Sequence, residues 1–245
     1  MSLIWALQWT RWLTALAVVL QTLELLEIKN LVRKFWPWEI LREEYPRPLR
    51  PFLRLLLGDR QFPYLLWLRL LAAMALLFHS SLGVLLVLLA TSYLINLRWR
   101  GTYNGGSDVM TFLLLSTLTV GELFGPSPKV LCACLWYIAV QSALSYFVAG
   151  WVKIAQPSWR SGKALNQFLR LHRIKVRLSP TMAWAMMLFE AAFPLALLYP
   201  ALTFPFLAAA FTFHLLNAKL LGLNRFVPAW LATYPAILFA SHSLG

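Results

Sequence analysis

Long apolar runs, separated by short charged gaps, dominate this chain, and we identify eight of them. They cover residues 12–28, 63–78, 82–97, 108–124, 130–152, 181–199, 203–221 and 226–242. A bilayer crossing needs about 20 mostly apolar residues. A backbone surrounded by lipid must also satisfy its hydrogen bonds internally. The pattern therefore predicts an all-α integral membrane protein in which each run is a helix.

The number of crossings depends on how two stretches are interpreted. The first run is the weakest, because Glu24 and Glu27 fall near its end, and without it seven helices remain. The stretch from Thr181 to Leu221 is almost continuously apolar and long enough for two crossings, so we place a turn at Pro200. We expect a bundle of seven or eight transmembrane helices that forms a single domain over residues 1–245.

Positive charge is distributed unevenly among the gaps. With the gaps numbered from the N-terminus, 20 of the 22 Lys and Arg residues belong to the odd side, and only Arg11 and Lys129 belong to the other. The positive-inside rule then places the odd gaps in the cytoplasm and, for eight crossings, both termini outside. We expect a multi-pass protein of the plasma membrane, which in a bacterium is the inner membrane.

The net charge of +13 predicts a negatively charged partner, and the lipid bilayer can be that partner. The basic residues flank apolar runs, where attraction to anionic lipid explains them. We therefore expect no nucleic acid partner. Residues 163–177 combine apolar and basic positions at helical spacing, which predicts an amphipathic helix on the inner surface. The first gap, with Trp36 and Trp38, predicts another segment lying on the surface.

Few ionisable residues interrupt the runs, and such residues usually mark function. Glu190 lies within the sixth run and His214 within the seventh, with Asn217 one turn further on. The turn at Pro200 puts Glu190 and His214 at similar depth, so they could share a proton or bind a polar group. The alternative is a hydrogen bond that only ties two helices together.

The fifth run carries a stripe of polar and small residues that leads to Lys153. One row is Gln141, Ser145 and Ala149, and the row beside it is Ser142, Tyr146 and Gly150. The stripe predicts a helix face turned toward the bundle interior. Its alternative explanation is close helix packing by small residues, with a lysine reaching to the interface.

A turn-like sequence, Tyr-Asn-Gly-Gly-Ser-Asp at 103–108, precedes the fourth run. Two adjacent glycines allow unusual backbone angles. Ser107 and Asp108 are suited to capping the helix N-terminus, and such a terminus attracts anions. The pattern also describes an ordinary capped turn.

Three segments in this order together resemble one family. They are residues 103–108, the Ala-Gly-Trp-Val-Lys of 149–153 with Trp159 and the Gly-Lys-Ala-Leu of 162–165 following, and Phe-His-Leu at 213–215 with Gly-Leu-Asn-Arg-Phe at 222–226. Glu190 and Pro194 lie between the second and the third segment. The set is similar to the HTTM family, the membrane domain shared with vitamin K-dependent γ-glutamyl carboxylases, over about residues 70–240. The short bacterial members are the most similar, and some of these serve the maturation of small peptide toxins.

The resemblance implies a chemistry and a set of residues. In the carboxylases a lysine at the position of Lys153 acts as a base toward reduced vitamin K, so it implies a reduced quinone as cofactor. The expected catalytic residues are Lys153, Glu190 and His214, and the expected substrate-binding residues are Asn104, Asp108 and Asn217. No metal ligand is among them. We expect an enzyme or maturation factor that acts on a small peptide precursor or a quinone-like lipid.

One departure limits the chemistry that carries over. Gly106 stands where the carboxylases have a histidine, so a polar group that would stabilise developing charge is missing. We expect that this chain does not carboxylate glutamate. The alternative function is a non-enzymatic one, as a partner subunit or transporter in a peptide-export or immunity system. A transporter would show repeated halves with broken helices, and we find no such repeat in the sequence.

Overall fold

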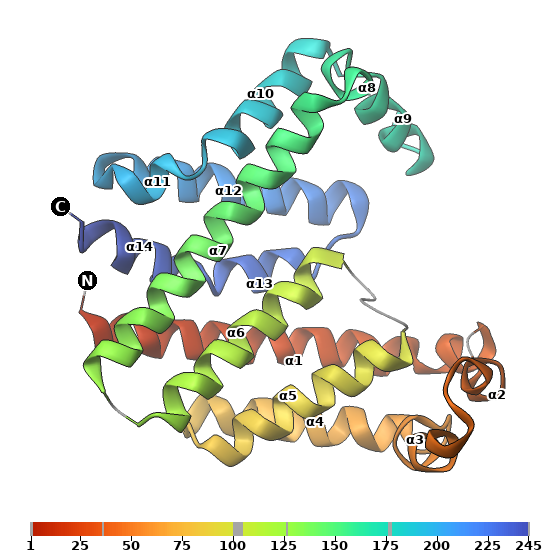
Figure 1. The fold of residues 1–245 in the computed structure, drawn as a ribbon. Coiled ribbons are helices and arrows are strands. Elements are labelled where there is room, and N and C mark those ends of the chain that lie inside the picture. Colours follow the sequence, from red (N-terminus) through yellow and green to blue (C-terminus); the bar gives the residue numbers. More distant parts are fainter. Residues whose placement is uncertain (1, 36, 100–104, 126, 176–177, 245) are drawn as a thin grey trace. The chain divides into compact units, whose positions relative to one another are not determined.

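The computed structural model describes residues 2–35, 37–99, 105–125, 127–175 and 178–244. Within these ranges the regular structure is helical and includes no strand. All eight apolar runs lie in helices (Figure 1). The chain divides into two compact units. Unit 1 comprises residues 1–10 and 128–245, and unit 2 comprises residues 11–127. The single domain expected over residues 1–245 stays a prediction.

Unit 2 contains the first four apolar runs. They correspond to α1 (Leu3–Phe35), α4 (Phe62–Phe78), α5 (Leu82–Arg98) and α6 (Gly105–Leu123). In sequence order α4 packs on α5, and α5 packs on α6. The connection from α1 to α4 contains α2 (Trp38–Leu41), the 3-10 turns η1 (Arg42–Glu44) and η2 (Arg47–Leu49), and α3 (Arg50–Leu57).

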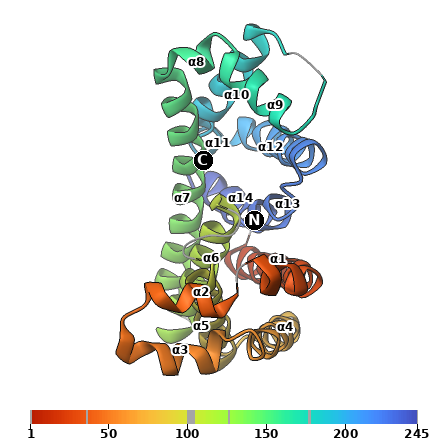
Figure 2. The same cartoon turned by 90° about the vertical axis from the view of Figure 1, so that its right-hand side faces the viewer.

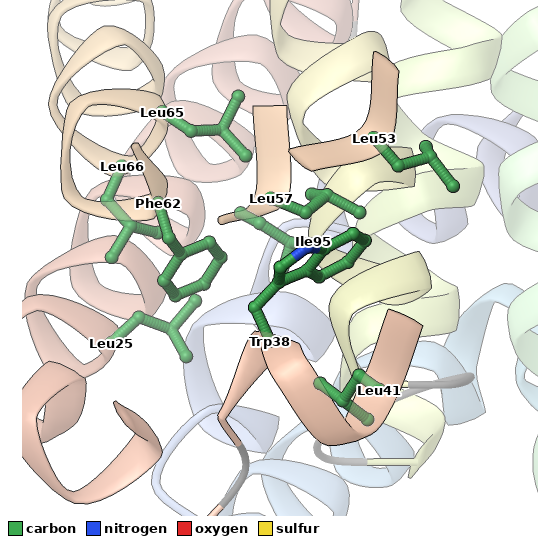
Figure 3. Close-up of a cluster of buried hydrophobic side chains, with 9 residues drawn as sticks. All are labelled: Leu25, Trp38, Leu41, Leu53, Leu57, Phe62, Leu65, Leu66 and Ile95. Atoms are coloured by element: carbon green, nitrogen blue, oxygen red, sulfur yellow. The ribbon is translucent and has the colours of Figure 1, made fainter. Parts of the chain in front are cut away.

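The sequence predicted that this connection lies on the surface, but part of it is buried. Its apolar side chains enter a buried cluster with residues of α1, α4 and α5 (Figure 3). The members are Leu25, Trp38, Leu41, Leu53, Leu57, Phe62, Leu65, Leu66 and Ile95. Burying each large apolar side chain contributes about 1.5–3 kcal/mol where water is the alternative. The segment is therefore fixed to the ends of three helices.

One of the charges counted for topology lies inside unit 2. Arg69 of α4 is buried, and its guanidinium donates to the Thr22 hydroxyl (3.0 Å), the Gln21 side-chain oxygen (3.3 Å) and the Ser92 hydroxyl (3.3 Å). Gln21 in turn donates to Thr111 at 2.7 Å. This network of polar side chains joins α1, α4, α5 and α6, so Arg69 serves the packing of helices.

Unit 1 contains the last four apolar runs. They form α7 (Pro128–Ala155), α10 (Pro180–Ala192) with α11 (Leu195–Leu198), α12 (Pro200–Leu221), and α13 (Phe226–Leu231) with α14 (Tyr234–His242). The turn predicted at Pro200 is confirmed, because α11 ends at Leu198 and α12 begins at Pro200. The long helix α7 packs against α10 and α14 (Figures 1 and 2). The amphipathic helix expected over residues 163–177 is the shorter α9 (Lys163–Leu171), and α8 (Pro157–Arg160) precedes it.

Three described helices are long and apolar enough to cross a membrane. They are Leu3–Leu31, Pro128–Ala155 and Pro200–Leu221, and a fourth span results if Arg47–Leu57 and Phe62–Phe78, bent by 60°, count as one. The first run, the weakest in the sequence, is therefore among the best supported. The 17 residues of α5 reach only about 26 Å at 1.5 Å per residue, against a hydrocarbon core of about 30 Å. Breaks near Pro194 and Pro235 shorten the helices of the sixth and eighth runs.

Candidate functional site

One face of α7 supplies the polar groups at the centre of unit 1. Ser142, Tyr146 and Gly150 are buried and follow each other at four-residue spacing, with Lys153 three residues further. In a helix this spacing places all four residues on one side. Of the two rows that the sequence offered, this one faces inward, whereas Ser145 of the other row is exposed.

Gly150 lets α7 and α10 approach each other closely. A Cβ atom at this position would lie 2.5 Å from the backbone nitrogen of Ala191, 2.7 Å from the carbonyl oxygen of Met187 and 2.9 Å from the Cβ of Glu190. No real Cβ could occupy that place without moving a helix backbone. The contact therefore depends on glycine, and it brings Glu190 beside the Lys153 end of α7.

Lys153 and Glu190 form a nearly buried ion pair. The Lys153 ammonium donates to both carboxylate oxygens of Glu190 at 2.6 Å. The side chain of Glu190 is only 4% exposed and that of Lys153 is 21% exposed. The ammonium also lies 5.6 Å from the centre of the Trp159 ring, a distance suited to a cation–π interaction. The two charges compensate each other, as burial requires.

A second polar contact lies deeper in unit 1. The Tyr146 hydroxyl and the Nε2 atom of His214 are 2.5 Å apart and share a hydrogen bond. His214 is 3% exposed, and its other nitrogen, Nδ1, is buried with no hydrogen-bond partner among the described residues. The side chain of Tyr234 is close enough to Tyr146 to interact with it. The imidazole thus keeps one nitrogen free.

Aromatic rings enclose the Tyr146–His214 contact. The Tyr146 ring stacks on Phe193 with centroids 4.0 Å apart and planes at 19°. The His214 ring stacks on Trp230 with centroids 5.3 Å apart, also at 19°. Trp230 and Tyr146 are themselves 4.7 Å apart, and Phe226 lies 6.0 Å from His214. These rings hold the two polar side chains in an apolar environment in which hydrogen bonds are strong.

The sequence paired Glu190 with His214, and the structure gives each a different partner. Glu190 bonds Lys153, and His214 bonds Tyr146. Both partners belong to α7, which packs directly against α10. Tyr146 also interacts electrostatically with Glu190. The two expected residues are therefore neighbours of one α7 face, which the turn at Pro200 alone could not reveal.

The predicted substrate-binding residues are dispersed. Asn217 lies one turn from His214 on α12 and is half-buried. Asp108 belongs to unit 2, in the first turn of α6. Asn104 lies outside the described residues. The helix α6 begins at Gly105, so Ser107 and Asp108 lie inside its first turn.

Sequence analysis missed two aromatic members of this site and the roles of two others. Trp230 and Tyr234 were not singled out, Trp159 was noted only within a family-like segment, and Tyr146 was noted only as part of a stripe. A tyrosine inside an apolar run is a usable signal, because its hydroxyl needs a partner when buried. A tryptophan among aliphatic residues gives no such signal, since core packing explains it equally well. No group of three or more His, Cys, Asp or Glu residues suited to a metal ion occurs in the described ranges.

The candidate site thus consists of a buried Lys153–Glu190 ion pair and an adjacent Tyr146–His214 contact with a free imidazole nitrogen. This arrangement offers a proton held between an amine and a carboxylate, together with a hydrogen-bonding atom in an aromatic surrounding. Comparison of the chain with family models, with curated proteins and with solved structures finds no match in any of the three.

Proposed function

We propose that this chain is an HTTM-like membrane enzyme or maturation factor, related to the vitamin K-dependent γ-glutamyl carboxylases, that acts on a small peptide or a quinone-like lipid. The observation that carries the proposal is the grouping of Lys153, Glu190, Tyr146 and His214 in unit 1. Ionisable groups buried within apolar helices are costly and usually serve function. The order of the three family-like segments along the chain adds to this support.

Lys153 is the proposed base, and Glu190 determines how it works. In the ion pair the amine carries a proton and cannot accept another. Transfer of that proton across either 2.6 Å contact to a Glu190 oxygen leaves a neutral amine and a neutral acid, with no net charge to bury. The neutral amine can then accept a proton from a substrate hydroxyl. Glu190 therefore takes up the proton that Lys153 must release before it can act as a base.

His214 is the proposed ligand-orienting residue. If Tyr146 donates to Nε2, the neutral imidazole carries its proton on Nδ1, which is then a free donor. If instead Nε2 donates to the tyrosine, Nδ1 is a free acceptor. Both forms suit a quinone-like lipid, which presents a carbonyl when oxidised and a hydroxyl when reduced. The rings of Trp230 and Phe193 offer flat apolar surfaces for such a ligand.

Binding of a naphthoquinone tests this proposal. The purified protein in a neutral detergent is titrated with menadione, and quenching of tryptophan fluorescence is followed, because Trp230 stacks on His214. We expect saturable quenching. The variant His214→Ala should bind about tenfold more weakly, which corresponds to one buried hydrogen bond of about 1.4 kcal/mol.

The matched control is His242→Ala. This histidine is also in unit 1, but it is exposed and bonds only the Leu238 carbonyl of its own helix among the described residues. Its replacement should leave the binding curve unchanged. Quenching that does not saturate, or equal affinity for wild type and His214→Ala, would contradict the proposed quinone site.

Carboxylation is a separate question. With Gly106 in place of a histidine, we expect no incorporation of labelled carbon dioxide into a glutamate peptide in the presence of reduced quinone. The control is the Lys153→Ala variant under the same conditions. Label that depends on Lys153 would show that the chain is a carboxylase after all.

The second candidate function is a non-enzymatic partner subunit or transporter. One observation favours it, because the Lys153–Glu190 pair and the close contact at Gly150 fasten α7 to α10 without any ligand. A protein with this role needs no quinone. The fluorescence titration therefore also separates the two candidates.

We also propose seven or eight crossings of the plasma membrane, with the odd gaps in the cytoplasm. The helical state of all eight runs and the 20-to-2 distribution of positive charge support this topology. A reporter enzyme active only outside the cytoplasm should be active when fused after Gly125 and silent when fused after Gly162. The reverse result would invert the topology.

A further inference from the structure

A second candidate site lies within unit 2 and includes none of the four residues that carry the proposed function. A cavity of about 80 Å³ opens where α1 ends, α4 begins and α5 ends. Its walls include Lys29, Asn30 and Arg33 of α1, Phe62 of α4, Asp59, and Arg98 of α5. The volume is several times the roughly 10–15 Å³ that a single water molecule needs. The cavity can therefore hold a group of several non-hydrogen atoms.

Arg98 is only half satisfied in this cavity. Its Nη2 atom donates to Asp59 at 2.5 Å, whereas Nε and Nη1 are buried and have no hydrogen-bond partner among the described residues. The side chain is 1% exposed, and the guanidinium lies 5.5 Å from the centre of the Phe62 ring. A buried donor without a partner is costly. An occupant with acceptor oxygens removes that cost.

The charges around the cavity identify the kind of occupant. Lys29, Arg33 and Arg98 supply three cations, and Asp59 is the single carboxylate among the lining residues. Both oxygens of Asp59 already accept from the backbone nitrogen of Trp38, at 3.2 and 3.1 Å, in addition to the bond from Arg98. Two positive charges are left without a counter-charge in the lining. An arginine fork beside further cations is the arrangement that recognises phosphate oxygens.

We propose that this cavity binds a phosphate group, supplied either by an anionic phospholipid headgroup or by free phosphate. Arg98 donates to the phosphate oxygens from within, and Lys29 and Arg33 compensate its charge from the rim. The position suits a headgroup, because Lys29 and Leu31 are close to the end of the first candidate span. Basic residues at such a place attract anionic lipids.

Thermal unfolding of the purified protein in a neutral maltoside detergent distinguishes the two sources. The additives are sodium phosphate against sodium chloride of equal ionic strength, and short-chain phosphatidylglycerol against short-chain phosphatidylcholine. We expect Tm to rise by about 5 °C at 100 times the dissociation constant. A rise with phosphate identifies free phosphate as a ligand, and a rise with phosphatidylglycerol alone identifies the headgroup. No rise, or an equal rise with phosphatidylcholine, overturns the proposal.

The direct variant is Arg98→Lys, which should abolish the rise in Tm. If it does not fold, variants at the rim of the cavity still test the site. Lys29→Gln and Arg33→Gln should each raise the half-saturating concentration of the effective additive about three- to tenfold. The control Arg47→Gln also removes one positive charge. Arg47 is exposed in the connection from α1 to α4 and does not line the cavity. This substitution should have no effect. Equal weakening by all three variants would indicate general attraction to a basic surface and would overturn the site.

Discussion

Both units bury a cation beside a carboxylate, but they complete the pair differently. In unit 1 the Lys153 ammonium bonds both oxygens of Glu190, and the charges cancel. In unit 2 the Arg98 guanidinium bonds Asp59 through one nitrogen, and its Nε and Nη1 have no hydrogen-bond partner among the described residues. Arg98 also lines a cavity with two more cations. The pair in unit 1 has complete hydrogen bonding between its partners and no net charge. The pair in unit 2 leaves donors unbonded and lies among additional positive charges.

This difference indicates what each unit can bind. Next to the neutral pair of unit 1, the described residues leave Nδ1 of His214 and the indole nitrogen of Trp230 without a hydrogen-bond partner, and these suit a neutral hydroxyl or carbonyl. In unit 2 the free groups are charged donors, which suit an anion. Similar buried ion pairs thus form two different sites, because different hydrogen-bonding atoms remain without a partner in each.

Removing the cation of unit 1 should have the largest effect. In Lys153→Met the Glu190 carboxylate stays buried without its counter-charge, so we expect the free energy of unfolding in detergent to fall by about 3 kcal/mol. The double variant Lys153→Met, Glu190→Leu buries no charge and should recover most of this loss. If the double variant is no more stable than the single one, the two side chains are not energetically coupled.

Glycine to alanine substitutions compare the packing of the two units. Gly150→Ala in unit 1 places a methyl group against the backbone of α10 and should cost about 2 kcal/mol of unfolding free energy. Gly83→Ala in unit 2 is the control, because nothing lies within 4 Å of its added Cβ. It should be neutral or slightly stabilising. Equal stability of the two variants would contradict the close contact of α7 and α10.

Asp59 offers a direct test of the incompletely bonded Arg98–Asp59 pair. Asp59→Asn removes the counter-charge of Arg98 but keeps an acceptor oxygen, so we expect a loss of about 1.5 kcal/mol in phosphate-free buffer. Added phosphate should stabilise Asp59→Asn more than it stabilises the wild type, because it replaces the lost counter-charge beside Arg98. Lys153→Met keeps the cavity of unit 2 intact, so phosphate should stabilise it only as much as the wild type. An equal effect of phosphate on all three proteins would remove the distinction between the sites.

The tyrosine–histidine contact should give the smallest effect. Tyr146→Phe removes the hydrogen bond to His214 and should lower the free energy of unfolding by about 1 kcal/mol. The control is Tyr137→Phe on the same helix, where the tyrosine is 51% exposed and we expect less than about 0.5 kcal/mol. Comparable losses from both variants would show that the 2.5 Å contact does not contribute to stability.

Much of the helical structure could be predicted from local sequence. The boundaries of the second and third runs agree with α4 and α5 to within one residue, and the turn at Pro200 is where it was expected. The breaks within the sixth and eighth runs were not predicted, although Pro194 and Pro235 were visible in the sequence. Prolines also begin helices, as Pro180 and Pro200 do here, so their presence alone does not specify a break.

The candidate site was predicted only in part. Lys153, Glu190 and His214 do lie in one unit, but the sequence assigned them the wrong direct partners. Arg98 was counted only as a charge flanking the membrane, and nothing in the sequence placed Asp59 beside it. A charge next to an apolar run is normally solvated, so its burial depends on the segment that covers it. Here the covering segment includes Trp38, whose backbone nitrogen also binds Asp59.

The sequence by itself determined the helical class, the eight apolar runs and the distribution of charge around them. These properties depend on composition and on backbone hydrogen bonds between residues four apart, which every apolar run contains. Only the tertiary structure decided the partners of the buried polar groups. Lys153 and Glu190 are 37 residues apart, Tyr146 and His214 are 68 apart, and Asp59 and Arg98 are 39 apart. Contacts at such separations depend on which helix faces meet, and that depends on packing across the whole unit.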